Sequence, residues 1–224
     1  MDWNYLSTEA AGTVCKVGST VSSLKVGDRV FGLIPGNMGN FTRSEAALVQ
    51  RIPDSATLLE AASMPLAYLT ALYALRDLGR LSQGESVLIQ SAAGSLGMAA
   101  IRIAQHLGAN IYATAGTEEK RRMLTDSFGI PQTQIFPSRD PQGIADLMKE
   151  TGPDGVDVIL SSARGDAMEE IWRCIAPGGR FIDVGRTDVL EAGNLGLDVF
   201  KRNATFSSFD MGLLHRQKPS LVAK

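Results

Sequence analysis

One segment, residues 86–115, constrains the fold of this 224-residue chain more than any other. The apolar run 86–90 predicts a buried strand, and residues 98–107 have the apolar spacing of a helix that packs against it. A second apolar run at residues 110–115 predicts another strand. Two strands joined through a helix pair in parallel, so the segment predicts a βαβ unit.

The turn between the first strand and the helix, residues 91–97, has the spacing A-x-G-x-x-G and is called the glycine turn below. Its glycines allow the backbone to turn tightly and to approach a pyrophosphate, whose charge the N–H groups and dipole at the helix N-terminus stabilise. The same spacing also occurs in tight turns that bind nothing, but its place in a βαβ unit favours a dinucleotide site. The residues predicted to contact the dinucleotide here are Ala93, Gly94, Ser95, Leu96 and Gly97.

The end of the second strand indicates which dinucleotide is bound. A site for NAD usually has Asp or Glu there, to accept hydrogen bonds from the adenosine ribose. This strand ends at Ala115-Gly116 without a carboxylate, and Lys120, Arg121 and Arg122 follow on the next predicted helix. Cations at this place can neutralise a 2′-phosphate, so we predict NADPH, with Gly116 and Lys120 as contacts. Arg121 and Arg122 are each expected in ordinary surface ion pairs.

The chain after residue 116 continues to alternate between strands and helices. Apolar runs predict strands at residues 134–138, 157–160, 179–184 and 204–209, with helices at 117–128, 143–150 and 165–175. The pattern predicts an α/β fold with a Rossmann-type doubly wound parallel sheet.

Ligands bind at the carboxyl ends of the strands in such a sheet. Val184 and Gly185 end the fifth strand and are predicted to border the nicotinamide end of the cofactor. Arg139 follows the third strand, where a loop would approach the adenosine end; an ordinary surface arginine is the alternative interpretation.

The first 55 residues have a different pattern. Runs at 13–17, 29–34 and 41–52 predict short strands separated by turn-forming residues. A predicted helical segment at residues 58–78 follows. We therefore expect a β domain at residues 1–55 and a dinucleotide-binding domain at residues 56–224.

Composition argues against two classes of partner. With 22 basic and 24 acidic residues the net charge is −2, which gives no electrostatic basis for binding nucleic acid or an anionic membrane. The chain has no apolar run of about 18 residues and no signal-peptide pattern, so a cytoplasmic protein is expected. Cys15 and Cys174 are expected to be buried, and with only two histidines no metal site has sensible spacing.

Several short motifs outside the glycine turn are characteristic of a family. They are Val17-Gly18-Ser19-Thr20-Val21, Lys25-Val26-Gly27-Asp28-Arg29-Val30, Leu69-Thr70-Ala71-Leu72-Tyr73-Ala74-Leu75, Glu118-Glu119-Lys120, Phe128-Gly129-Ile130-Pro131, Ile135-Phe136-Pro137-Ser138-Arg139, Gly155-Val156-Asp157-Val158-Ile159-Leu160 and Trp172-Arg173-Cys174-Ile175-Ala176. Together they resemble the medium-chain dehydrogenase/reductase superfamily, and within it the enoyl reductase domains of fungal highly reducing polyketide synthases. The resemblance covers nearly the whole chain.

The resemblance implies that NADPH delivers hydride to the β-carbon of an α,β-unsaturated thioester on an acyl carrier protein, after which the α-carbon is protonated. It implies that the first strands form part of a GroES-like β module and that Thr70 lies near the nicotinamide half of the cofactor. It implies no metal, because zinc-dependent relatives have Gly-His-Glu where this chain has Ser7-Thr8-Glu9. Hydrogen bonds or cationic side chains must then stabilise the enolate charge.

The chain departs from this family at two places. The family has Gly-Lys after the fifth strand and Asp after the sixth, where this chain has Gly185-Arg186 and Asp210; the resemblance makes Arg186 and Asp210 the catalytic residues. A guanidinium stabilises negative charge but is a very poor proton donor at neutral pH. After the fourth strand the family's Leu-Asn-Ser-Leu reads Leu160-Ser161-Ser162-Ala163, which places Ser161 near the nicotinamide.

Three functions therefore remain open from the sequence. The first is an NADPH-dependent enoyl reductase that takes its substrate from an acyl carrier protein and works beside other synthase domains. The second is a catalytically silent structural domain of a synthase, in which Arg186 and Asp210 form an ion pair without chemistry. The third is a quinone-type oxidoreductase. Relative to the family the chain is expected to be truncated at both ends, which would expose apolar surface and a sheet edge and favour a homodimer or association with other domains.

Overall fold

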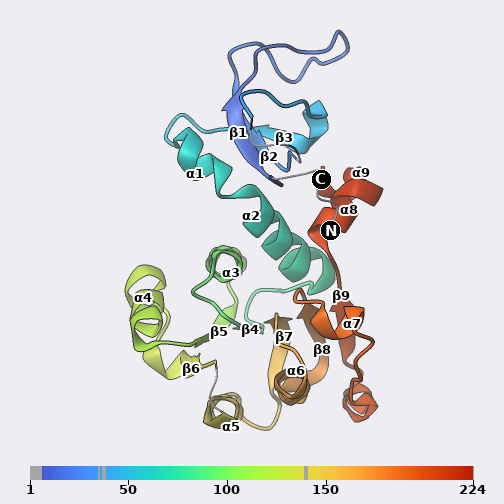
Figure 1. Ribbon diagram of the computed structural model, residues 1–224. Helices are drawn as coiled ribbons and strands as arrows, with labels where there is room; N and C mark the ends of the chain where they lie inside the picture. The colour runs from blue at the N-terminus through green and yellow to red at the C-terminus, as the bar shows by residue number, and fades with distance from the viewer. Residues whose placement is uncertain (1–6, 35, 37–38, 139–140, 224) are drawn as a thin grey trace. The chain divides into compact units, whose positions relative to one another are not determined.

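The computed structural model describes residues 7–34, 36, 39–138 and 141–223 (Figure 1). These residues form two compact units. The first contains the residues up to Leu69 together with those from Met211 onward, and the second is Thr70–Asp210. None of the helices in the described part of the chain is both long and apolar enough to cross a membrane.

The second unit is built on a six-stranded sheet in which every neighbouring pair is parallel. Its strands are β4 (Ser86–Ile89), β5 (Asn110–Ala115), β6 (Ile135–Pro137), β7 (Val156–Ser161), β8 (Ile175–Asp183) and β9 (Thr205–Ser208). They lie in the order β6-β5-β4-β7-β8-β9, so the direction of winding reverses between β4 and β7. The predicted Rossmann-type doubly wound sheet is confirmed, and this reversal is where such sheets bind their ligands.

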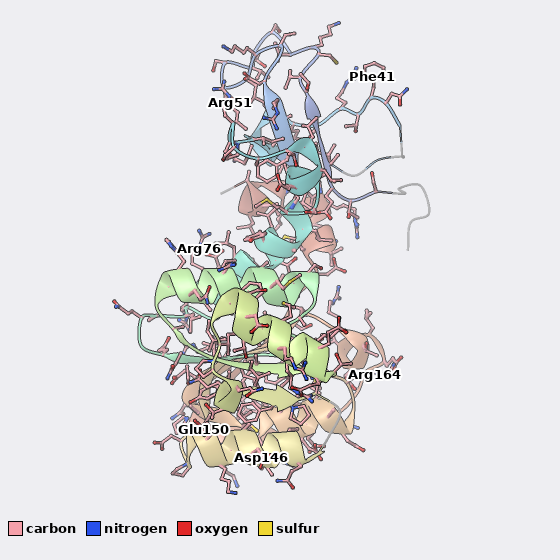
Figure 2. The ribbon with its side chains drawn as sticks, turned by 90° about the vertical axis from the view of Figure 1, so that its left-hand side faces the viewer. Phe41, Arg51, Arg76, Asp146, Glu150 and Arg164 are labelled. Atoms are coloured by element: carbon pink, nitrogen blue, oxygen red, sulfur yellow. The ribbon has the colours of Figure 1, made fainter. Side chains whose placement is uncertain are left out.

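Helices cover both faces of this sheet. The α-helices here are α3 (Ser95–Leu107), α4 (Glu118–Phe128), α5 (Pro141–Thr151), α6 (Asp166–Trp172) and α7 (Thr187–Leu190), and a 3-10 helix, η4, spans Leu197–Arg202. Figure 1 shows α3 and α4 on one face and α5 and α6 on the other. Charged residues such as Glu150 on α5 and Arg164 after β7 lie at the surface of this unit (Figure 2).

Aromatic side chains fill the core on one side of β8. The Trp172 ring meets Phe181 edge-on at 5.6 Å between centroids, and Phe181 stacks on Phe206 at 5.3 Å. The Trp172 indole N–H donates to the Gly196 carbonyl at 2.9 Å, so the one polar atom of this buried side chain is satisfied. This packing attaches the segment before β9 to the sheet.

Most predicted elements agree with the structure to within a few residues, and β5 agrees exactly. One strand is longer than expected: β8 begins at Ile175 instead of residue 179. Ile175 already pairs with Val156 before a register shift, so the pairing of β8 starts earlier in the chain than the apolar run suggested.

The first unit contains the three-stranded antiparallel sheet β1 (Ala10–Thr13), β2 (Arg29–Gly32) and β3 (Val49–Arg51). Two expected strands were wrongly placed. The strand expected at 13–17 lies earlier, and the one expected at 41–52 is reduced to three residues because Ala46–Leu48 forms a 3-10 helix, η1. Cys15 therefore lies beyond the end of β1 and is exposed, not buried as expected, whereas Cys174 is buried.

The helical segment expected at 58–78 is divided into α1 (Leu58–Ala62), α2 (Pro65–Leu72) and a π-helix, η2 (Tyr73–Leu78). Pro65 lacks the N–H that a continuous helix needs, so a new helix begins there. Two further helices, α8 (Met211–Gln217) and α9 (Pro219–Val222), end the described chain.

The division into units also differs from the expected boundary at residue 55. Helix α1 packs on β1 and β2, and the Glu9 carboxylate accepts a hydrogen bond from the Leu66 N–H at 2.7 Å, so residues 56–69 belong with the first unit. The residues from Met211 onward also join that unit, although the sequence assigned them to the dinucleotide-binding domain.

Arg180 lies in β8, just after the register shift, and its charge is buried. Its guanidinium binds the Glu85 carboxylate at 2.8 and 3.0 Å and donates to the carbonyls of Gly79 and Arg80. Only 11% of the Arg180 side chain is exposed. These hydrogen bonds lower the pKa of the Glu85 carboxyl.

Arg180→Met should destabilise the protein, because it removes the guanidinium that binds the Glu85 carboxylate and donates to the Gly79 and Arg80 carbonyls. We expect the free energy of unfolding at pH 7 to fall by about 3 kcal/mol, as for other broken buried pairs. Urea denaturation followed by tryptophan fluorescence measures this change. Arg76→Met is the matched control: the Arg76–Asp77 pair is exposed, so its loss should cost less than about 1 kcal/mol (Figure 2). Equal losses would contradict the assignment.

The same pair predicts a pH dependence. Because the folded-state pKa of Glu85 lies below its ordinary value of 4.5, its contribution is present above that value and is lost as the pH falls through the lowered pKa. The stability difference between wild type and Arg180→Met should therefore shrink over this acidic range. A difference that stays constant down to the acid transition would argue against the role of Glu85.

Candidate active site

Hydrogen bonds from both neighbouring strands hold the start of the glycine turn. The N–H of Gln90 donates to the Leu160 carbonyl of β7 at 3.0 Å. The N–H of Ser91 donates to the Thr114 hydroxyl and that of Ala92 to the Thr114 carbonyl, at 3.0 and 2.9 Å, and Thr114 is on β5. The turn is thus fastened at the point where the winding of the sheet reverses.

Helix α3 begins at Ser95, one helical turn earlier than predicted, so the last three residues of the glycine turn form its first turn. A Cβ atom on Gly97 would lie 2.5 Å from the Ala92 Cα, so the helix packs against the turn with no room for a side chain. Gly94 is the N-cap and supplies no capping side chain. The first N–H groups of a helix have no acceptor within it, and together with the helix dipole they favour an anion at this end.

At the end of β5, Gly116 is exposed and Thr117 caps α4 by accepting the Lys120 N–H at 3.3 Å. The Arg121 guanidinium binds the Glu118 carboxylate at 2.9 Å, and that of Arg122 lies 3.6 Å from the same carboxylate. Lys120 is exposed, and its ammonium has no ion pair within the residues that the structure describes. Of the three cations, Lys120 is the one left for a ligand; Arg139 lies outside the described residues.

An apolar cavity of about 130 Å³ lies beside the ends of β4, β5 and β6, on the face covered by α5 and α6. Its lining includes Leu88, Gln90, Thr114, Ser138, Ile144 and Glu170. No local sequence pattern indicates this cavity, because its walls come from segments that are far apart in the chain.

Ser161 ends β7 and is only 1% exposed. Its hydroxyl donates to the Gln90 side-chain oxygen and accepts the Ala163 N–H, both at 3.0 Å, while the Ser162 N–H donates to the same Gln90 oxygen at 2.8 Å. The Ser161 hydroxyl therefore shapes the loop after β7. Gln90, which the sequence analysis did not single out, joins this loop to the glycine turn; its signal is a polar residue at the end of an apolar strand.

The loops after β7 and β8 lie against each other. The Val184 N–H donates to the Ser161 carbonyl at 2.9 Å. A Cβ atom on Gly185 would lie 2.9 Å from the Ser162 carbonyl oxygen, so glycine is required for this close approach.

The structure brings Arg186 and Asp210 together in an ion pair of 2.9 Å, although 24 residues separate them. One follows β8 and the other follows β9, which are adjacent parallel strands. The side chains are 22% and 41% exposed. The Tyr73 ring meets that of Phe209, the residue before Asp210, edge-on at 5.0 Å.

Thr70 precedes the strands of the large sheet in the chain. It is half-buried in α2 and is the first residue of the second unit. The triplet Ser7-Thr8-Glu9 is engaged in the first unit. Ser7 pairs with Gly36, and Glu9 binds the Leu66 N–H. Nowhere in the described residues do three or more His, Cys, Asp or Glu side chains form a group that could hold a metal ion.

These residues fit a nicotinamide dinucleotide. The glycine turn and the start of α3 suit a pyrophosphate, the exposed Lys120 lies beyond the end of β5, and the loops after β7 and β8 border the site where the sheet reverses. The predicted residues at the carboxyl edge of the sheet are thus gathered from five separate strand ends.

Comparisons with known proteins agree with this geometry. A family model described as zinc-binding dehydrogenase matches residues 95–223. The highly reducing polyketide synthase xilA of Penicillium crustosum is 44% identical over 220 residues, and prosolanapyrone synthase of Alternaria solani is 45% identical over 212. These matches cover 98% and 95% of this chain, but only 9% and 8% of those synthases.

Solved structures give the same result. The CurK enoyl reductase has a TM-score of 0.84 and 35% identity, covering 96% of this chain and 63% of that one. The nucleotide-binding subdomain of the enoylreductase domain of PpsC from Mycobacterium tuberculosis has a TM-score of 0.65 and 42% identity, covering 70% of this chain and 86% of that one.

Gly97→Ala should distort the glycine turn and the start of α3, because the added Cβ cannot be accommodated against Ala92. We expect the affinity for a nicotinamide dinucleotide to fall by about 10-fold or more, since the start of α3 must move away from the pyrophosphate position. Fluorescence titration measures the dissociation constant. Gly12→Ala is the control, because a Cβ there meets nothing within 4 Å. Unchanged affinity in folded Gly97→Ala protein would rule out this turn as the pyrophosphate site.

Proposed function

This chain belongs to the zinc-binding dehydrogenase family and, within it, to the enoyl reductase domains of polyketide synthases; on that premise we propose that it uses NADPH to reduce the α,β double bond of an enoyl thioester. The observation that carries the proposal is the glycine turn, fastened between β5 and β7 at the reversal of the sheet. This chain spans 9% and 8% of the length of the two synthases named above.

The preference for NADPH rests on the end of β5. No carboxylate follows this strand before Glu118, and Glu118 is already bound by Arg121. The ammonium of Lys120 is exposed on the first turn of α4 and can bind a 2′-phosphate. A ribose without that phosphate would find neither the carboxylate acceptor of an NAD site nor an anion-dependent contact.

When bound, NADPH supplies the hydride for the β-carbon of the substrate. The residues of the chain hold the two reactants and stabilise the charge that develops. The glycine turn binds the pyrophosphate, and the backbone of Ser161, Val184 and Gly185 borders the nicotinamide end. The Arg186 guanidinium stabilises the negative charge on the thioester oxygen, because it is a permanent cation with several N–H donors. Asp210 orients this guanidinium through their 2.9 Å ion pair.

Arginine remains protonated at neutral pH, so Arg186 is assigned to charge stabilisation and not to proton transfer. The α-carbon then takes its proton from water or from another positioned donor. This differs from the lysine that the family resemblance places here, whose ammonium can both stabilise charge and give up a proton.

The relatives suggest the form in which the substrate arrives. The two synthases named above match nearly the whole of this chain, and xilA is described as a highly reducing polyketide synthase. We therefore propose an acyl carrier protein as the carrier of the enoyl thioester and other synthase domains as neighbours. A homodimer through exposed apolar surface belongs to the same proposal.

A catalytically silent synthase domain is the second candidate, favoured by one observation. Arg186 and Asp210 already neutralise each other at 2.9 Å, as in a purely structural ion pair. A silent domain would keep its fold and the cradle but would not turn over. A quinone-type oxidoreductase would instead reduce free quinones with the same cofactor.

Lys120→Ala tests the cofactor preference. We expect wild type to bind NADPH more tightly than NADH, and the variant to lose about 10-fold in NADPH affinity, as for the loss of one charge-assisted hydrogen bond. NADH affinity should not change. Lys149→Ala, another exposed lysine, on α5, is the matched control. Equal affinity of wild type for NADPH and NADH, or an unchanged variant, would overturn the assignment of Lys120.

Turnover separates the candidate functions. With a crotonyl thioester, wild type should oxidise NADPH, and Arg186→Met should lower kcat by about 100-fold with NADPH affinity unchanged, as for loss of an oxyanion-stabilising group. Absorbance at the nicotinamide band follows the reaction. Binding of NADPH without turnover of any substrate would favour the silent domain, and turnover of quinones alone would favour the third function.

A further inference from the structure

Asp183 is the last residue of β8 and has no role in the function described so far. It is only 2% exposed, in a strand whose other buried residues, apart from Arg180, are apolar or glycine. Its carboxylate accepts from the Gly185 N–H at 3.0 Å, from the Arg186 N–H at 3.2 Å and from the Ser208 hydroxyl at 3.0 Å. A buried carboxylate with this many donors is a site where the sequence has placed a charge for a purpose.

The first purpose lies in the loop after β8. Arg186 adopts φ +59°, the left-handed region that non-glycine residues rarely occupy. The Gly185 and Arg186 N–H groups that donate to Asp183 belong to the two consecutive peptides that lead into this conformation. The carboxylate therefore holds the backbone from which the Arg186 guanidinium projects.

The second purpose lies on the neighbouring strand. Ser208 is the register partner of Asp183 in the β8–β9 pair and stands two residues before Asp210. Strand β9 is at the edge of this sheet and pairs only with β8 within it. The hydrogen bond from the Ser208 hydroxyl to Asp183 therefore fixes the end of β9, from which the chain continues to Asp210.

We propose that Asp183 is a positioning residue that aligns both members of the Arg186–Asp210 pair with the substrate. One carboxylate sets the backbone of Arg186 directly and that of Asp210 through Ser208. The proposal rests on the proposed function, in which Arg186 stabilises the enolate charge that develops on the thioester oxygen. Asparagine replaces Asp183 only in part, because the amide has one acceptor oxygen where the carboxylate uses two, and it carries no charge.

The chain contains a matched carboxylate at the other edge of the same sheet. Asp157, near the start of β7, accepts from the Ser86 N–H and hydroxyl at 2.8 and 2.7 Å. It too joins a strand to a serine on its neighbour, but where the strands begin. Asp157→Asn is therefore the control for the structural cost of removing such a charge.

The test compares Asp183→Asn with Asp157→Asn in the complete protein, using NADPH and a crotonyl thioester. We expect Asp183→Asn to lower kcat by about 10- to 100-fold, as for a small displacement of a reacting group, with NADPH affinity within about 2-fold of wild type. Asp157→Asn should lower the urea midpoint but leave kcat within about 2-fold. In an Arg186→Met background, Asp183→Asn should have almost no further effect, because it acts through Arg186.

Two results would overturn the proposal: an equal fall of kcat in both asparagine variants, or a full additional fall in the Arg186→Met background. If Asp183→Asn does not fold, Ser208→Ala removes one contact of the same carboxylate and should still lower kcat several-fold.

A readout independent of turnover separates this proposal from the proposed function. If wild type does not reduce the thioester, the function fails, but amide hydrogen exchange still tests the positioning. Asp183→Asn should speed exchange at the Gly185 and Arg186 amides by about 10-fold relative to Asp157→Asn, since their acceptor is weakened. Unchanged exchange at these amides would overturn the positioning role.

Discussion

The hydrogen bonds that hold residues 90–92 between two strands are the constraint on which the site depends. Thr114 on β5 accepts the first two N–H groups of the glycine turn. The Leu160 carbonyl on β7 accepts the N–H of Gln90, the residue before the turn. Because the turn is fixed on both sides, α3 can start against it, and Gly97 must have no side chain. The sheet therefore sets the position of the start of α3.

The same principle recurs along the carboxyl edge of the sheet. Gln90 joins the glycine turn to the loop after β7, the Val184 N–H joins β8 to β7, and Asp183 joins β8 to β9. Each link is a polar side chain or backbone group that is satisfied only when the strands are in register. Buried polar groups left without partners are costly, so these links favour one arrangement of the loops. The order of the strands thereby determines which loops lie next to each other at this edge.

Local sequence signals predict the large sheet well. The apolar runs give the bounds of β5 exactly and those of its other strands to within a few residues, and the three cations after β5 are evident in the sequence. Local signals fail where contacts between residues distant in sequence decide the structure. Two strands of the first unit were misplaced, because pairing with β2 ends β1 at Thr13 and a 3-10 helix precedes β3. Residues 56–69 belong to the first unit because α1 packs on β1 and β2.

The sequence by itself determined the parallel α/β architecture, the glycine turn and the absence of a carboxylate at the end of β5, since each is a property of neighbouring residues. Only the tertiary structure decided which charges are engaged. It paired Arg121 with Glu118, brought Arg186 to Asp210 across 24 residues, and buried Asp183 beneath them. The physical reason is that a hydrogen bond or ion pair depends on distance in space. In a parallel sheet the strand ends that meet at one edge are far apart in the chain.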